Sequence, residues 1–234
     1  MLVYTIKELC RTCYTCVREC PAKAIRIVGG QAEVIDERCI ACGNCTKVCS
    51  QGAKVFLNTT DRVLKLLDTR KNVAALLAPS FPAEFQEIAD YRNLIGMIRM
   101  LGFRYVHEVS FGADLVARRY KELVDAGNQY YISSDCPSIV NYIKHYHTNL
   151  VENLAPVVSP MVAMSRVIRS KYGQDISVVF IGPCVAKKAE STEIDEAITF
   201  SELRELFDLY RIGRDNVTPT DFDPPLGGRG AIFP

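Results

Sequence analysis

The pattern of apolar and polar positions changes near residue 58. Before it, short segments alternate between apolar and polar residues; after it, continuous apolar runs alternate with longer amphipathic segments. In the first part, Ala24–Val28 and Gln31–Ile35 predict two strands joined by a two-glycine hairpin turn. Leu2–Ile6 and Ala53–Leu57 predict a second strand pair. The first part therefore reads as a small α+β module.

The second part predicts a different architecture. Asn72–Ala78 is an apolar run without alternation, which is typical of a buried parallel strand. Further strands are expected at Arg104–Val109, Gln129–Ile132 and Ile176–Ile181. Helices are expected at Asp61–Arg70, Pro82–Leu101, Ala113–Ala126, Pro137–His147, Pro160–Tyr172 and Ser201–Tyr210, the last with Ser201 as its N-cap. Strands that alternate with helices predict an α/β domain with a mostly parallel sheet.

This pattern divides the chain into residues 1–58, a helical linker at 59–71, and the α/β domain at 72–234. The 234 residues are 48% hydrophobic and carry a net charge of +1, as in an ordinary soluble domain. So weak a charge predicts no binding to nucleic acid or anionic membranes. The chain has no apolar stretch of about 18 residues and no signal peptide. We expect a cytoplasmic protein without membrane insertion.

Eight of the ten cysteines lie in the first 49 residues. They form two C-x2-C-x2-C-x3-C runs, Cys10, Cys13, Cys16 and Cys20, then Cys39, Cys42, Cys45 and Cys49. In this spacing three thiolates bind one [4Fe–4S] cluster, and the fourth binds the other cluster. We expect one cluster on Cys10, Cys13, Cys16 and Cys49, and the second on Cys39, Cys42, Cys45 and Cys20. Zinc and disulfides are the alternatives, disfavoured by the duplicated spacing and the missing signal peptide. The module resembles two-cluster bacterial ferredoxins.

The other two cysteines, Cys136 and Cys184, each follow an expected strand. Loops at the carboxyl ends of parallel strands gather at one edge of the sheet, where ligands bind. The alternative is that both are buried structural thiols.

The sequences around these two cysteines resemble motifs of the [FeFe]-hydrogenase large subunit. Ser133-Ser134-Asp135-Cys136-Pro137-Ser138-Ile139 is similar to TSCCPxW, and Gly182–Glu190 is similar to MPCxxKxxE. Other similar landmarks are Ala78-Pro79-Ser80, Leu101-Gly102-Phe103, Gly112-Ala113-Asp114-Leu115 and Ser159-Pro160. The resemblance implies that residues 72–234 form the first lobe of an iron-hydrogenase H-domain.

In that family Cys136 and Cys184 would bind the [4Fe–4S] part of the H-cluster, which also contains a diiron subsite. Lys187 would donate a hydrogen bond to a cyanide of that subsite, and Glu190 would support the loop. The ferredoxin clusters would exchange electrons with this centre during hydrogen oxidation or proton reduction. The resemblance thus implies an iron–sulfur oxidoreductase that works anaerobically.

Several positions depart from the family pattern. Asp135 replaces a proton-relaying cysteine, and we expect its carboxylate to relay protons instead. On the proton path, Glu122 is retained, but Arg119 and Ala155 replace a glutamate and a serine. A cation and a methyl group do not shuttle protons as a carboxylate and a hydroxyl do. These departures imply a divergent branch of the family with a sensory role.

The family's third motif supplies two more cysteine ligands, and no cysteine follows Cys184. We therefore expect an H-cluster to form only with a missing C-terminal part, as if the chain were cut or one half of a split protein. Whether the chain is an enzyme stays open. The alternatives are an electron-transfer protein with the two ferredoxin clusters alone, or a non-catalytic relative of the Nar-type iron–sulfur proteins. Expected partners are a redox protein such as a ferredoxin, a signalling domain, or the C-terminal half.

Overall fold

The computed structural model describes residues 1–127 and 129–229. Contacts divide the chain into two compact units. Residues 1–57, 130–155 and 184–190 form the first, which we call the cysteine-rich unit. The described parts of 58–129, 156–183 and 191–234 form the second, which we call the sheet unit. Contacts therefore group the segments of Cys136 and Cys184 with the N-terminal module, whereas the linear division assigned them to residues 72–234.

The N-terminal part of the cysteine-rich unit is built from two copies of one structural repeat. Strand β1 (Val3–Thr5) pairs antiparallel with β4 (Lys54–Phe56), and β2 (Ile25–Val28) pairs antiparallel with β3 (Gln31–Val34). Each residue of the first repeat corresponds to the residue 29 positions later in the second repeat. This offset relates the 3-10 helices η1 (Lys7–Leu9) and η2 (Asp36–Arg38), and also the short helices α1 (Thr15–Glu19) and α2 (Asn44–Lys47). The hairpin turn at Gly29-Gly30 is as predicted, with a positive φ at both glycines.

Three later elements complete this unit: helix α7 (Pro137–Tyr146), η3 (Thr148–Asn153) and η4 (Val185–Ala189). The Tyr146 hydroxyl donates to the carbonyl oxygens of Ala22 (2.6 Å) and Arg38 (3.1 Å). Val185 packs with Val3 and Val34 in a small apolar cluster. Side chains more than 100 residues apart in sequence thus hold α7 and η4 against the N-terminal module.

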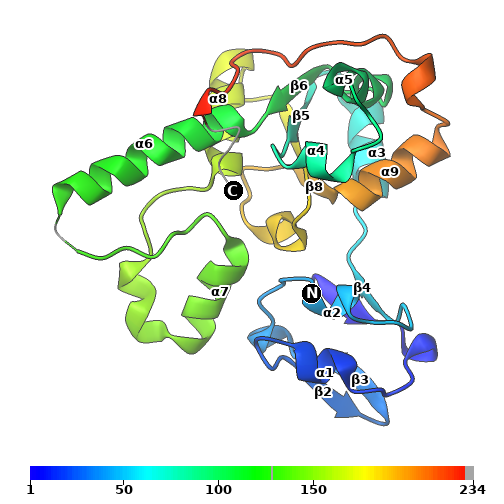
Figure 1. Ribbon diagram of the computed structural model, residues 1–234, viewed down its shortest axis with the longest axis vertical. Coiled ribbons are helices and arrows are strands. Elements are labelled where there is room, and N and C mark those ends of the chain that lie inside the picture. Colours follow the sequence, from blue (N-terminus) through cyan, green and yellow to red (C-terminus); the bar gives the residue numbers. More distant parts are fainter. Residues whose placement is uncertain (128, 230–234) are drawn as a thin grey trace. The chain divides into compact units, whose positions relative to one another are not determined.

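The sheet unit contains a four-stranded parallel sheet in the order β6-β5-β7-β8 (Figure 1). The strands are β5 (Val73–Leu77), β6 (Tyr105–Glu108), β7 (Ser177–Gly182) and β8 (Glu196–Thr199). Every residue of β5 and β7 is buried, as expected for central strands covered on both faces. The helices are α3 (Thr60–Thr69), α4 (Phe81–Glu84), α5 (Tyr91–Met100), α6 (Ser110–Ala126), α8 (Pro160–Tyr172) and α9 (Phe200–Leu209).

The predicted fold class is confirmed, an α+β ferredoxin-like module followed by an α/β domain with a parallel sheet. Two element predictions are wrong. The single helix at Pro82–Leu101 is instead α4 and α5, and Asp90 caps α5 by accepting from the Arg92 N–H at 3.0 Å. Gln129–Ile132 is not a strand; only Ile132 forms an isolated bridge, with Leu154. Tyr130 is 93% exposed, so this tetrapeptide is not covered on both faces as a central strand would be.

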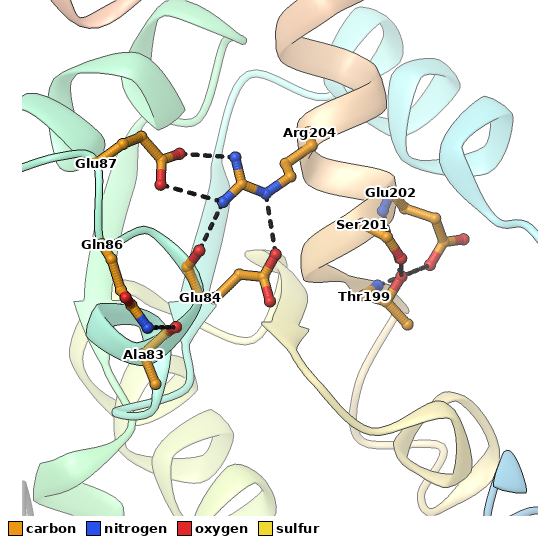
Figure 2. A network of polar contacts seen from close by, with 8 residues as sticks. All are labelled: Ala83, Glu84, Gln86, Glu87, Thr199, Ser201, Glu202 and Arg204. Atoms are coloured by element: carbon orange, nitrogen blue, oxygen red, sulfur yellow. Dashed lines mark hydrogen bonds and ion pairs between the residues drawn. The ribbon is translucent and has the colours of Figure 1, made fainter. Parts of the chain in front are cut away.

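The start of α9 also differs from the prediction, because Thr199 rather than Ser201 is the N-cap (Figure 2). Glu202, 1% exposed, accepts from the backbone N–H groups of Thr199 (2.7 Å) and Thr59 (2.8 Å). Strand β8, which ends at this cap, was not predicted. The Glu202 carboxylate therefore joins the start of α9 to the start of α3.

Figure 2 also shows Arg204 of α9 bound to two carboxylates near α4. Its guanidinium pairs with Glu84 (2.9 Å) and Glu87 (2.7 Å). The hydrogen bond from Arg204 lowers the pKa of Glu87. These contacts fix α4 against α9. None of the helices within residues 1–127 and 129–229 has the length and apolar character needed to cross a membrane.

Candidate functional site

The eight N-terminal cysteines line two cavities of similar size. Cys10, Cys13, Cys16 and Cys49 line the first cavity, of about 20 Å³. The second cavity, also of about 20 Å³, is lined by Cys20, Cys39, Cys42 and Cys45. The fourth cysteine of each run has crossed to the other cavity. Cys20 follows α1 and Cys49 lies just beyond α2, so the short helices carry these thiols across. Each cavity gathers the four thiols that the spacing assigned to one cluster.

Left-handed backbone conformations shape both cysteine loops. Thr12 (φ 54°) and Tyr14 (φ 62°) in the first loop correspond to Ala41 (φ 56°) and Gly43 (φ 75°) in the second. Non-glycine residues adopt this region rarely and at a cost in energy. The turns direct successive cysteine side chains of a loop toward the same cavity.

Backbone N–H groups donate to three of the sulfur atoms. Ala32 donates to Cys10 (3.5 Å), Ala24 to Cys20 (3.3 Å) and Ala41 to Cys39 (3.4 Å). The hydrogen bond from Ala32 is the main cause that lowers the pKa of Cys10. Such bonds stabilise negative charge on sulfur, which a cluster ligand must carry.

Burial has the opposite effect on the deeper thiols. It raises the pKa of Cys45 to about 11 and also raises the pKa of Cys16 and of Cys39. A buried thiol in apolar surroundings is unreactive unless a cation or a metal compensates its charge. Iron in the cavity would supply that compensation.

The two remaining cysteines occupy equivalent positions on different elements. Cys136 is the N-cap of α7, and Cys184 is the N-cap of η4; both have extended backbone conformations. Cys136 is exposed and Cys184 is partly buried. Neither is therefore the fully buried structural thiol considered as an alternative.

Lys187 connects the segments that carry these two cysteines. Its Nζ donates to the carbonyl oxygen of Asp135 at 2.9 Å and pairs with Glu190 Oε2 at 2.5 Å. The side chains of Lys187 and Glu190 are each 13% exposed. The Asp135 carboxylate accepts from Ser133 Oγ at 3.0 Å. The structure thus brings together the predicted residues Asp135, Lys187 and Glu190, next to the two cysteines.

The predicted proton-path residues are not in this group. Glu122 lies on α6 in the sheet unit, where its exposed carboxylate pairs with Arg119 at 2.5 Å. Ala155 is buried in the cysteine-rich unit. The ion pair occupies the one carboxylate retained from the path, so a role of Glu122 in proton transfer stays a prediction.

Sequence reasoning missed Lys54, which lines the first cavity. It is 3% exposed, and its Nζ donates to Thr5 Oγ1 (2.5 Å) and to the Ala32 carbonyl oxygen (3.4 Å). The 29-residue offset could have identified it, because the matching position in the other repeat is the apolar Ile25.

Two family models match the chain. "Iron only hydrogenase large subunit, C-terminal domain" matches residues 71–234, and "4Fe-4S dicluster domain" matches residues 2–50. A curated relative, the NADP-reducing hydrogenase subunit HndD of Solidesulfovibrio fructosivorans, is 25% identical over 240 residues. That match covers 87% of this chain and 41% of the relative. A subunit of an ion-translocating oxidoreductase complex of Methanosarcina acetivorans is 48% identical over 44 residues, 19% of this chain and 17% of the relative.

Solved [FeFe]-hydrogenase structures share the fold. A variant of HydA1 from Chlamydomonas reinhardtii superposes with a TM-score of 0.62 at 23% identity. A structure of HydA(deltaEFG), described as revealing stepwise H-cluster assembly, superposes with a TM-score of 0.60 at 24% identity. Each match covers 74% of this chain and 52% of the other. The chain therefore spans about half the length of these structures and less than half of HndD.

Proposed function

We propose, since the chain belongs to the family of iron-only hydrogenase large subunits, that it transfers single electrons through two [4Fe–4S] clusters. One cluster is held by Cys10, Cys13, Cys16 and Cys49, and the other by Cys20, Cys39, Cys42 and Cys45. The observation that carries this proposal is that each cavity is lined by four thiols, three from one cysteine run and one from the other. A cubane needs four thiolates around a volume, and this pattern supplies four on each side.

The second cluster is the one placed to exchange electrons with the segments of Cys136 and Cys184. Val185 packs in an apolar cluster with Cys39 and Cys45. Tyr142 of α7 packs in another with Cys20 and Cys39. Both lone cysteines thus begin elements that contact the wall of the second cavity. An electron entering at the first cluster would reach them through the second.

Hydrogen chemistry requires more ligands than these residues provide. Cys136 and Cys184 are two thiols, whereas a cubane takes four ligands. These two cysteines alone therefore do not hold a complete cluster. With further ligands supplied, Cys136 and Cys184 would hold iron, and Lys187 would keep their segments together through Asp135. Hydrogen oxidation, proton reduction or a sensory response to either would then draw on the two clusters.

The partner of this protein is a redox protein or subunit that exchanges single electrons. The curated relatives are described as subunits, which supports such an assembly. We place it in an anaerobic cytoplasm, because the exposed thiols Cys13 and Cys42 are vulnerable to oxidation and disulfide formation elsewhere.

Iron counting after anaerobic reconstitution tests the proposal. The wild-type chain should bind about eight irons with matching sulfide. Cys16→Ala removes a buried ligand of the first cavity and should lose about half of both. The matched variant Cys136→Ala lies outside both cavities and should keep all of them. Zinc in place of iron, or equal iron loss in the two variants, would refute the assignment.

A further inference from the structure

The two cluster cavities have related frameworks but different electrostatic surroundings. The first cavity is lined by Thr5, Gln51 and Lys54. At the corresponding positions, 29 residues away, the second cavity is lined by Val34, Ala22 and Ile25. The two repeats therefore share their cysteine ligands but differ in the other residues that line the cavities. Among the described residues that line the second cavity, none is charged.

Arg11 also lines the first cavity, where the repeat has Ile40 in the second, but Arg11 is exposed and water screens its charge. Buried Lys54 is therefore the main electrostatic difference between the two sets of walls. Its ammonium group is buried and donates to Thr5 Oγ1 and to the Ala32 carbonyl oxygen. Ala32 in turn donates its N–H to Cys10 Sγ. No described carboxylate pairs with the Lys54 ammonium in a salt bridge, so its nearest negative charge would be that of the cluster and its thiolates.

A buried cation stabilises the more negative state of a nearby group. Reduction adds one negative charge to a cluster, and net charge, hydrogen bonds to sulfur and solvent exposure set cluster potentials. A charge inside a protein is screened far less than one at the surface. The field of Lys54 also reaches Cys45 of the second set. The ammonium itself, however, lines the first cavity.

We propose that Lys54 raises the reduction potential of the cluster on Cys10, Cys13, Cys16 and Cys49 above that of the cluster on Cys20, Cys39, Cys42 and Cys45. This inference rests on the proposed function, because it needs both clusters. A single electron then resides on the first cluster at equilibrium. An electron that enters the protein is therefore held by the first cluster. Its transfer to the second cluster is energetically uphill. The second cluster is the one against which α7 and η4 pack.

The test uses the full 234-residue chain, reconstituted anaerobically and titrated electrochemically with detection by electron paramagnetic resonance. Cys13→Ser, which changes an exposed ligand of the first set, identifies the signal of that cluster. Lys54→Gln removes the charge but keeps a hydrogen-bond donor. It should shift the one-electron equilibrium between the clusters at least tenfold toward the second, equivalent to about 59 mV.

Two variants control for the site and for the charge. Lys47→Gln removes a charge from the exposed face of α2, where water and salt screen it, and should change the equilibrium less than twofold. Lys54→Arg keeps the charge and should retain the wild-type order of the potentials. Should Lys54→Gln fail to load iron, Lys54→Met, which suits apolar walls, replaces it.

The outcomes separate this inference from the proposed function. Wild-type protein that binds far fewer than eight irons would refute the proposed function. Full iron loading together with an unchanged cluster equilibrium in the neutral Lys54 variant would refute only the role of Lys54. An equal shift from Lys47→Gln would also refute it, since the effect would then be one of overall charge.

Discussion

Replacing Lys187 by methionine tests whether one side chain holds the two lone-cysteine segments together. The substitution leaves an unbranched side chain that is one atom shorter, and it removes the charge. It deletes the hydrogen bond to the Asp135 carbonyl oxygen (2.9 Å) and the ion pair with Glu190 (2.5 Å). The segment ending at Cys136 then loses this hydrogen bond to the segment that begins at Cys184.

The magnitude follows from the burial of the pair. Exposed ion pairs contribute about 0 to 1 kcal/mol, but both of these side chains are only 13% exposed. A hydrogen bond to a charged group contributes about 1.5 to 3 kcal/mol, and leaving a fully buried charge unpaired costs about 3 to 5 kcal/mol. For this largely buried pair we expect a loss of about 2 to 4 kcal/mol in local stability.

Hydrogen exchange read by mass spectrometry measures this loss directly. Amides in residues 130–136 and 184–190 should exchange roughly 30-fold to several hundredfold faster in Lys187→Met, since each 1.4 kcal/mol is about tenfold. Lys144→Met, which removes an exposed lysine of α7, should leave both segments protected.

A double-mutant cycle with Glu190→Gln identifies the ion pair as the cause. The double variant should lose less stability than the two single losses added together, by about 0.5 to 3 kcal/mol. Strict additivity would show that Glu190 does not support Lys187, and unchanged exchange in Lys187→Met would refute the idea that Lys187 joins the two segments.

Two further predictions concern the sheet unit. His107 is fully buried, and burial lowers its pKa from 6.5 to about 4. As the pH falls, the unfolded chain therefore binds the proton before the folded chain does. The free energy of unfolding should decrease between about pH 6.5 and pH 4, by about 3 kcal/mol in total. His107→Phe should flatten that slope in urea unfolding at several pH values, and an unchanged slope would contradict the assignment. Glu202→Ala removes the carboxylate that accepts from the N–H groups of Thr199 and Thr59. It should lower the free energy of unfolding by about 2 to 4 kcal/mol. The control Glu205→Ala changes an exposed residue of the same helix and should lower it by less than about 0.5 kcal/mol.

Features that depend on local spacing could be predicted from the order of the residues. The two cysteine runs predicted which four thiols share a cavity, because the gaps between them set which side chains one short loop can present together. The apolar runs at β5 and β7 predicted central parallel strands, since only strands covered on both faces need to be apolar throughout. The motifs around Cys136 and Cys184 predicted the family from residues that lie close together in the chain.

The contacts between segments that lie far apart in the chain could not be predicted in this way, because they form only when the chain folds. Cys136 and Cys184 belong with the ferredoxin-like module, because Tyr146, Tyr142 and Val185 pack against residues more than 100 positions away. The break between α4 and α5 and the cap at Thr199 were missed for a related reason. The apolar pattern of a helix continues through Pro82–Leu101, so the pattern alone does not show the break. Arg204 binds Glu84 of α4, and Glu202 binds the backbone of Thr59, and both partners lie far from α9 in the sequence. Lys54 reads as an ordinary strand lysine until β1 and β3 fold over it, and that folding buries its charge in the wall of the first cavity.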